Sequence, residues 1–151
     1  MAGVFNRGKF LLLQEFFLTT GAPTNIYAAL VTSATAPAVD HNTFSELTEI
    51  TAGNGYATGG YSLARNGTDF DSLVENDTDD RAEVQAKDIV WTASGGPIPL
   101  SGDGARYMVF IDDDVTIGSR QLVAWFDLGS DRSVSNGQSL TIQNAEVRLT
   151  E

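Results

Sequence analysis

Residues 53–63, which read Gly-Asn-Gly-Tyr-Ala-Thr-Gly-Gly-Tyr-Ser-Leu, constrain the fold more than any other part of the chain. Glycine tolerates a positive φ angle, so Asn54-Gly55 and Gly59-Gly60 predict sharp bends or bulges. Tyr56 and Tyr61 favour the pleated, half-buried surface of a sheet. This combination is typical of a β-protein, and no reactive group is needed to explain it.

Short segments rich in β-branched and aromatic residues recur along the rest of the chain, with turn signals between them. Long helical patterns do not alternate with them. We therefore predict a mainly β fold, a single-domain β-sandwich or distorted barrel of about six to eight antiparallel strands with a short N-terminal helix. Besides the tyrosine segment, the expected strands are 25–32, 84–92, 106–111, 121–128 and 139–149.

Three further signals concern the connections between strands. Residues 44–50 place apolar side chains at every third position, which predicts one or two helical turns. Asn136-Gly137 is a strong turn marker. Residues 66–83 are polar and acidic with little periodicity, so we expect them to form an exposed loop.

The strongest apolar run lies near the N-terminus, at Phe10 to Leu18. Periodicity alone does not separate a buried helix from a buried strand in so short a run. We predict a short helix, because Leu, Gln and Glu are good helix formers and Gly21-Ala22-Pro23 supplies a stop signal. The expected organisation is an N-terminal arm with this helix at 1–23, followed by the β-sandwich domain at 24–151.

Charge restricts the classes of partner. The 151-residue chain holds 20 acidic and 9 basic residues, a formal net charge of -11. Such a field repels phosphate backbones and anionic membrane surfaces, so we expect neither nucleic acid nor membrane as a partner. A partner with a basic surface is well matched to it. There is no cysteine, so packing or assembly has to supply the stability.

The residues needed for catalysis are sparse. His41 is the only histidine, no Gly-x-Ser-x-Gly elbow accompanies it, and no Gly-Lys-Ser/Thr phosphate loop occurs. The acidic clusters at 69–80 and 112–114 do not follow the spacing of a calcium loop. We therefore expect no enzyme activity, no cofactor and no metal, and we interpret His41 and these acids as solvated loop residues. A weak structural calcium site is the alternative for the acids.

Aromatic residues on predicted strands have two interpretations. Trp91 and Trp125 stand among Ile, Val, Leu and Phe, which favours a place in the core. Tyr56 and Tyr61 are flanked by glycine, so we expect them to be more accessible. A stacking platform for sugar rings is the alternative for the four residues together.

The order of several segments between residues 24 and 150 resembles that of small virion proteins of tailed bacteriophages. In that group a Gly-Tyr-x-x-Gly-Gly element precedes a strand with a Trp-Thr pair, then an aromatic strand ending in acids, then an acidic turn with glycine. The matching segments here are Gly55-Tyr-Ala-Thr-Gly-Gly, Ile89-Val-Trp-Thr-Ala, Arg106-Tyr-Met-Val-Phe-Ile-Asp-Asp and Trp125-Phe-Asp-Leu-Gly-Ser-Asp. The apolar run at 10–18 departs from the pattern.

This resemblance implies a structural role in the virion. We expect a capsid cement, or head decoration, protein that sits on the capsid surface as a trimer and binds the major capsid protein. Linked weak contacts of this kind hold far more tightly than one contact. The alternative is a tail or tail-fibre component that binds a host receptor or a glycan. The candidate interface residues are Arg7, Lys9, Phe10, Phe16, Phe17, Tyr56 and Tyr61.

Overall fold

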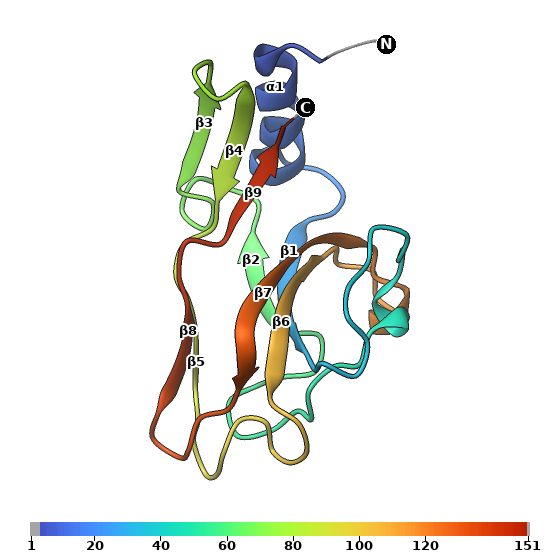
Figure 1. Ribbon diagram of the computed structural model, residues 1–151, viewed down its shortest axis with the longest axis vertical. Helices are drawn as coiled ribbons and strands as arrows, with labels where there is room; N and C mark the ends of the chain where they lie inside the picture. The colour runs from blue at the N-terminus through green and yellow to red at the C-terminus, as the bar shows by residue number, and fades with distance from the viewer. Residues whose placement is uncertain (1–3, 151) are drawn as a thin grey trace.

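The computed structural model describes residues 4–150, which form an N-terminal helix and a set of antiparallel sheets (Figure 1). Helix α1 spans Asn6–Leu18 and is followed, within the described residues, by nine strands. The sheets are open and do not close into a barrel. The predicted mainly β fold is confirmed, and the chain is a single sandwich-like domain.

Four strands form the larger sheet: β1 (Asn25–Val31), β2 (Tyr61–Ala64), β6 (Ala105–Ile111) and β7 (Leu122–Arg132). Their order is β2-β1-β6-β7, and all neighbours are antiparallel. The central strands β1 and β6 are covered on both faces, which explains their continuous apolar sequences. β7 is an edge strand.

The other layer is built around a long two-stranded ribbon. It contains β4 (Arg81–Gln85) and β5 (Ile89–Thr92) on one side, and β8 (Ser139–Ile142) and β9 (Glu146–Leu149) on the other. Ala82 lies opposite Leu149 and Ile89 lies opposite Ile142, so one register runs through both pairs. Between the two pairs of strands, the Ala86 amide donates to the Ala145 carbonyl oxygen at 2.9 Å, in the same register. Figure 1 shows the ribbon along the long axis of the molecule.

The main hydrophobic core lies between the larger sheet and the ribbon. Four phenylalanine rings run through it in contact: Phe17 to Phe70 at 4.9 Å between centroids, Phe70 to Phe110 at 6.1 Å, and Phe110 to Phe126 at 5.1 Å. This row joins α1, the loop after β2, and strands β6 and β7. Trp91 is buried beside it, as predicted.

Helix α1 belongs to this core and is not a free arm. Leu13 and Phe17 are buried, and the helix packs on β4 and on β3 (Ser72–Asn76). Lys9 is also buried, because its ammonium donates to the Asp80 carbonyl oxygen at 2.7 Å in the turn between β3 and β4. The helix begins at Asn6 rather than near residue 10, since Arg7 and Lys9 find partners on this hairpin.

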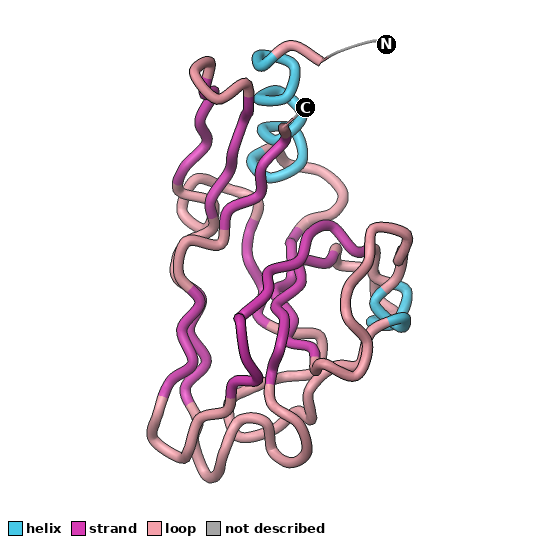
Figure 2. Tube along the Cα trace, viewed as in Figure 1, coloured by secondary structure: helices cyan, strands magenta, loops and turns pink. Residues whose placement is uncertain are grey.

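A smaller cluster covers the opposite face of the larger sheet. Val31, Val109 and Ile111 pack there against Phe44 and Leu47. The predicted turns at 44–50 are confirmed in part as a short 3₁₀ helix at Phe44–Glu46. Figure 2 shows that most of the chain between β1 and β2 is loop rather than strand.

The structure corrects the expected loop at 66–83. Residues 72–76 and 81–85 pair as β3 and β4, and Asp80 takes a φ of 50° in the turn between them. The Asn76 side chain accepts the amide hydrogens of Thr78 and Asp79, so the polar residues build the hairpin turn.

Two other expectations are also corrected. The strand at 139–149 is divided into β8 and β9, and Asn144 takes a φ of 56° in the division. Trp125 was expected in the core, but its exposed fraction is 45%. It points away from the main core because Phe126, its neighbour in a strand, points into it. The turn predicted at Asn136-Gly137 is confirmed, with a φ of 83° at Gly137.

Gly60, in the tyrosine segment, lies very close to the backbone of β1. Its φ is +86°, and a Cβ there would lie 2.1 Å from the Ala28 carbonyl oxygen. Gly137 has a similar φ of +83° but nothing within 4 Å of its Cβ position. A side chain would therefore meet backbone strain at both positions but steric clash only at Gly60.

We predict that Gly60→Ala lowers the free energy of unfolding by about 3 kcal/mol or more, because clash adds to strain. Gly137→Ala, the matched control, should cost about 1–2 kcal/mol from strain alone. Urea unfolding of both variants measures the difference. Equal losses would contradict the close approach of Gly60 to β1.

Candidate functional site

An apolar groove of about 530 Å³ opens between α1, the start of β7 and β9. Leu12 is 59% exposed on its rim, although its side chain is fully apolar. Phe16 and Pro23 continue the wall beside the helix. The groove is lined by Leu12, Leu13, Phe16, Phe17, Pro23, Asp112, Gln121, Leu122, Val123, Val147 and Leu149.

A second groove, of about 490 Å³, continues the opening between the far end of β7 and β8. Leu128 and Arg132 line it from β7, while residues 139–143 line it from β8 and its end. Since β7 and the β8–β9 strand bound both grooves, the two together form the open side of the sandwich.

Apolar side chains at the margin of the main core line the open side. Val123, Leu128, Leu140 and Val147 are only partly buried, and all four pack on the main core. The lining of the first groove is mainly apolar, whereas Arg132, Ser139, Thr141 and Gln143 make the second groove partly polar. Partly covered apolar surface of this kind is typical of a site that contacts another protein.

Three consecutive carboxylates stand at one end of the open side, in the loop after β6. Asp112 lines the first groove, and its Oδ1 accepts the amide hydrogen of Gln121 at 3.0 Å. Asp113 accepts the amide hydrogen of Thr24 at 2.7 Å, and Asp114 accepts that of Thr116 at 2.8 Å. Among residues 4–150 no basic side chain forms an ion pair with any of the three.

Of the residues predicted from the N-terminal segment, Phe16 lies in the open side. Arg65 stacks on its ring at 5.6 Å. Arg7 is exposed, pairs with Glu75 at 3.3 Å, and lies over the half-buried ring of Phe10. The candidate interface is wrong at Lys9 and at Phe17, because both side chains are buried within their own chain.

The prediction that Tyr56 is accessible is also wrong. Its side chain is 2% exposed, and its hydroxyl donates to Glu49 Oε1 at 2.7 Å while accepting the Leu30 amide hydrogen at 2.9 Å. Burial, followed by the negative charge of Glu49, raises the pKa of Tyr56. This tyrosine holds the glycine segment on β1.

Tyr61 is half-buried beside Trp91, with the Lys87 ammonium 5.5 Å from its ring centroid. It does not line either groove of the open side.

Glu49 forms the centre of a polar network under the glycine segment. Its Oε1 also accepts the Gly59 amide hydrogen at 2.6 Å. Arg120 donates to the Gly59 carbonyl oxygen at 3.2 Å, and its guanidinium lies 3.9 Å from the Tyr27 ring centroid. Burial raises the pKa of Glu49, and the hydrogen bonds from Tyr56 and Gly59 oppose this only in part. The network closes on itself, so we interpret it as structural.

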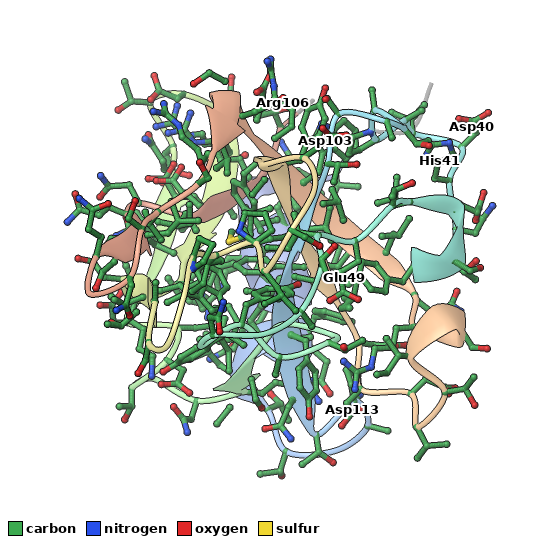
Figure 3. All side chains as sticks on the ribbon, turned by 90° about the horizontal axis from the view of Figure 1, so that it is seen from below. Asp40, His41, Glu49, Asp103, Arg106 and Asp113 are labelled. Carbon is green, nitrogen blue, oxygen red and sulfur yellow. The ribbon has the colours of Figure 1, made fainter. Side chains whose placement is uncertain are left out.

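His41 lies in a loop, where its Nδ1 accepts the Ala38 amide hydrogen at 3.3 Å. Figure 3 shows Asp40 and His41 at the edge of the molecule, apart from Glu49. The hollow beside His41, Leu47 and Trp125 has a volume of only about 110 Å³.

Some residues of the acidic clusters have partners within the chain. Asp69 pairs with Lys87 at 2.5 Å, and Asp77 accepts a hydrogen bond from the Asn6 amide at 3.2 Å. In the part of the chain described, no three His, Cys, Asp or Glu side chains gather as metal ligands would. No helix of residues 4–150 has the length and apolar character needed to cross a bilayer.

We predict that Glu49→Gln becomes more stable relative to wild type as pH rises from about 3.5 to about 7.5. The pKa of Glu49 is raised in the folded chain, so its stabilising contribution is complete below the unfolded-state pKa and is lost as pH rises through the folded-state pKa. Thermal melts of both proteins across this range measure the difference.

Asp127→Asn is the control with the opposite sign. Hydrogen bonds from Arg106 hold the pKa of Asp127 below its ordinary value, so that contribution is present at higher pH and is lost as pH falls. A flat profile for Glu49→Gln would contradict the raised pKa of Glu49.

No family model, curated protein or solved structure matches this chain. The open side, the carboxylates beside it and the overall charge are therefore the physical basis for a functional proposal.

Proposed function

We propose that this protein is a structural component of a tailed-phage virion, a capsid cement protein that binds the major capsid protein on the outer surface of the shell. The single observation that carries the proposal is the open side of the sandwich, whose first groove has a volume of about 530 Å³ and an apolar lining. In this role the chain acts by cohesion and performs no catalysis.

The apolar side chains of this region support contact with another protein. Leu11 is 48% exposed and Leu12 is 59% exposed on the outer face of α1, next to the groove. Phe5, just before the helix, is 88% exposed. Burying one such side chain contributes about 1.5–3 kcal/mol, so a few of them give a contact of useful strength.

A cement protein has to hold neighbouring subunits together with individually modest contacts. Several copies acting at once, in the trimer that we propose, multiply those contacts into tight binding. The net charge of -11 adds a preference for a basic surface on the shell. The resemblance to small virion proteins points to the same class of function.

A tail component that binds a receptor or a glycan is the second candidate. Trp125 supports it, because 45% of its surface is exposed beside the hollow at His41. Tyr56, one of the two tyrosines expected to stack on a ligand, is buried. We therefore place the cement function first.

We predict that the wild-type protein sediments with expanded capsid shells and that the double variant Leu12→Glu with Val123→Glu binds them more weakly by about tenfold or more, since two buried apolar contacts are lost. Val39→Glu is the matched control, because Val39 is 90% exposed and lies outside both grooves. Co-sedimentation over a range of protein concentrations measures the affinities.

Circular dichroism and thermal melting establish that all the variants are folded. Electron cryomicroscopy of the particles locates the bound protein. The proposal fails if the wild-type protein does not bind shells, or if the double variant binds as tightly as Val39→Glu.

A further inference from the structure

The edge of β7 that faces the open side has no strand beside it. β7 spans eleven residues and pairs with β6 along its other edge. On the open edge, Leu122 donates to the Asn42 carbonyl oxygen at 2.9 Å, and Val134, beyond the strand, exchanges bonds with Ile98. Between these two points, no backbone hydrogen bond from the rest of residues 4–150 reaches this edge.

The opposite wall of the open side is also a strand edge. β8 pairs only with β5, and β9 only with β4, among the described strands. Their other edge faces the grooves: Val147 and Val123 both line the first groove, and Leu140 and Leu128 both line the second. Two strand edges therefore border a trough that is apolar at the first groove and mixed polar and apolar at the second.

The charges along the trough are unequal at its two ends. Arg132, at the β8 end, is engaged by its own chain, since its guanidinium donates to the Leu128 carbonyl oxygen at 3.0 Å. At the α1 end stand Asp112, Asp113 and Asp114, which accept only backbone hydrogen bonds within the described residues. A cation at this end would gain favourable interactions with three carboxylates.

We infer that the open side accepts an extended segment of the partner protein, which adds alongside β7 as a β-strand. Its backbone pairs with the free edge, alternate apolar side chains fill the grooves, and a lysine or arginine lies against Asp112–Asp114. Strand addition to an exposed sheet edge is a general mode of peptide recognition. The inference rests on the proposed function for the identity of the partner.

Charge favours a different protein over a second copy of this chain as the donor. A second copy of this chain would bring a net charge of -11, and no excess of basic residues, to the three carboxylates, whatever contacts elsewhere hold the proposed trimer together. A basic and apolar segment is attracted by both the overall field and the three carboxylates.

Hydrogen exchange locates the added strand directly. The probes are expanded capsid shells and a synthetic nine-residue peptide of alternating valine and threonine that ends in two lysines. We expect either ligand to slow exchange by about tenfold or more at those amides of residues 123–131 that point away from β6, while the buried amides of β1 stay unchanged. A peptide with proline in place of every valine and threonine is the control, because those positions then have no amide hydrogens for pairing.

The charge component is tested with Asp113→Asn combined with Asp114→Asn. Asparagine keeps the oxygen that accepts the backbone hydrogen bonds but removes both charges. We expect peptide binding to weaken by about fivefold at low salt, and by less as the salt concentration rises. Fluorescence anisotropy of the labelled peptide measures both effects.

The outcomes separate the two proposals. Protection of residues 123–131 by either ligand supports the strand-acceptor site. If the peptide protects β7 but shells do not bind, the cement function fails and the acceptor site stands. If shells bind and neither ligand protects β7, the cement function stands and the acceptor site is overturned. If nothing binds and β7 exchanges at an unchanged rate, both are overturned.

Discussion

The contact of four phenylalanine rings across the molecule is the interaction on which the rest of the structure depends. Phe17 comes from α1, Phe70 from a loop, and Phe110 and Phe126 from the larger sheet. Aromatic side chains bury about 150–250 Å² each, so this row is a large contribution to the core. Because the row ends at α1 on one side and at β7 on the other, it also sets the distance between the two walls of the first groove.

The central strands β1 and β6 differ from the edge strand β7 in the number of neighbouring strands. β1 and β6 have neighbours on both edges and side chains packed on both faces. β7 has a neighbour on one edge only, and proteins ordinarily protect such edges with charge, bulges or a covering segment. Here the pairing with β6 shifts register near both ends of β7, between Leu122 and Ala124 and between Asp127 and Arg132, and no backbone hydrogen bond from the described residues reaches the outer edge between these shifts. An edge left open in its apolar half is consistent with use by another chain.

The sequence carried enough information for the core strands and too little for the open side. Residues 25–31 and 105–111 form continuous apolar runs, and such runs are buried whatever their neighbours. Leu140, Ile142, Val147 and Leu149 alternate with polar residues as core-facing strands do, and alternation does not reveal whether another layer covers them. The β3–β4 hairpin was missed because its turn is polar and acidic. Lys9 was misjudged because its buried ammonium is satisfied by a carbonyl oxygen distant in sequence.

The unbroken register of the ribbon has a mechanical consequence. Hydrogen bonds in an antiparallel ladder lie perpendicular to the strands, so tension along the strands loads many of them at once rather than one after another. The ribbon extends from residues 82–92 on one side to 139–149 on the other. A force that pulls residues 82–92 and residues 139–149 in opposite directions along the strands would therefore load the whole ladder in shear.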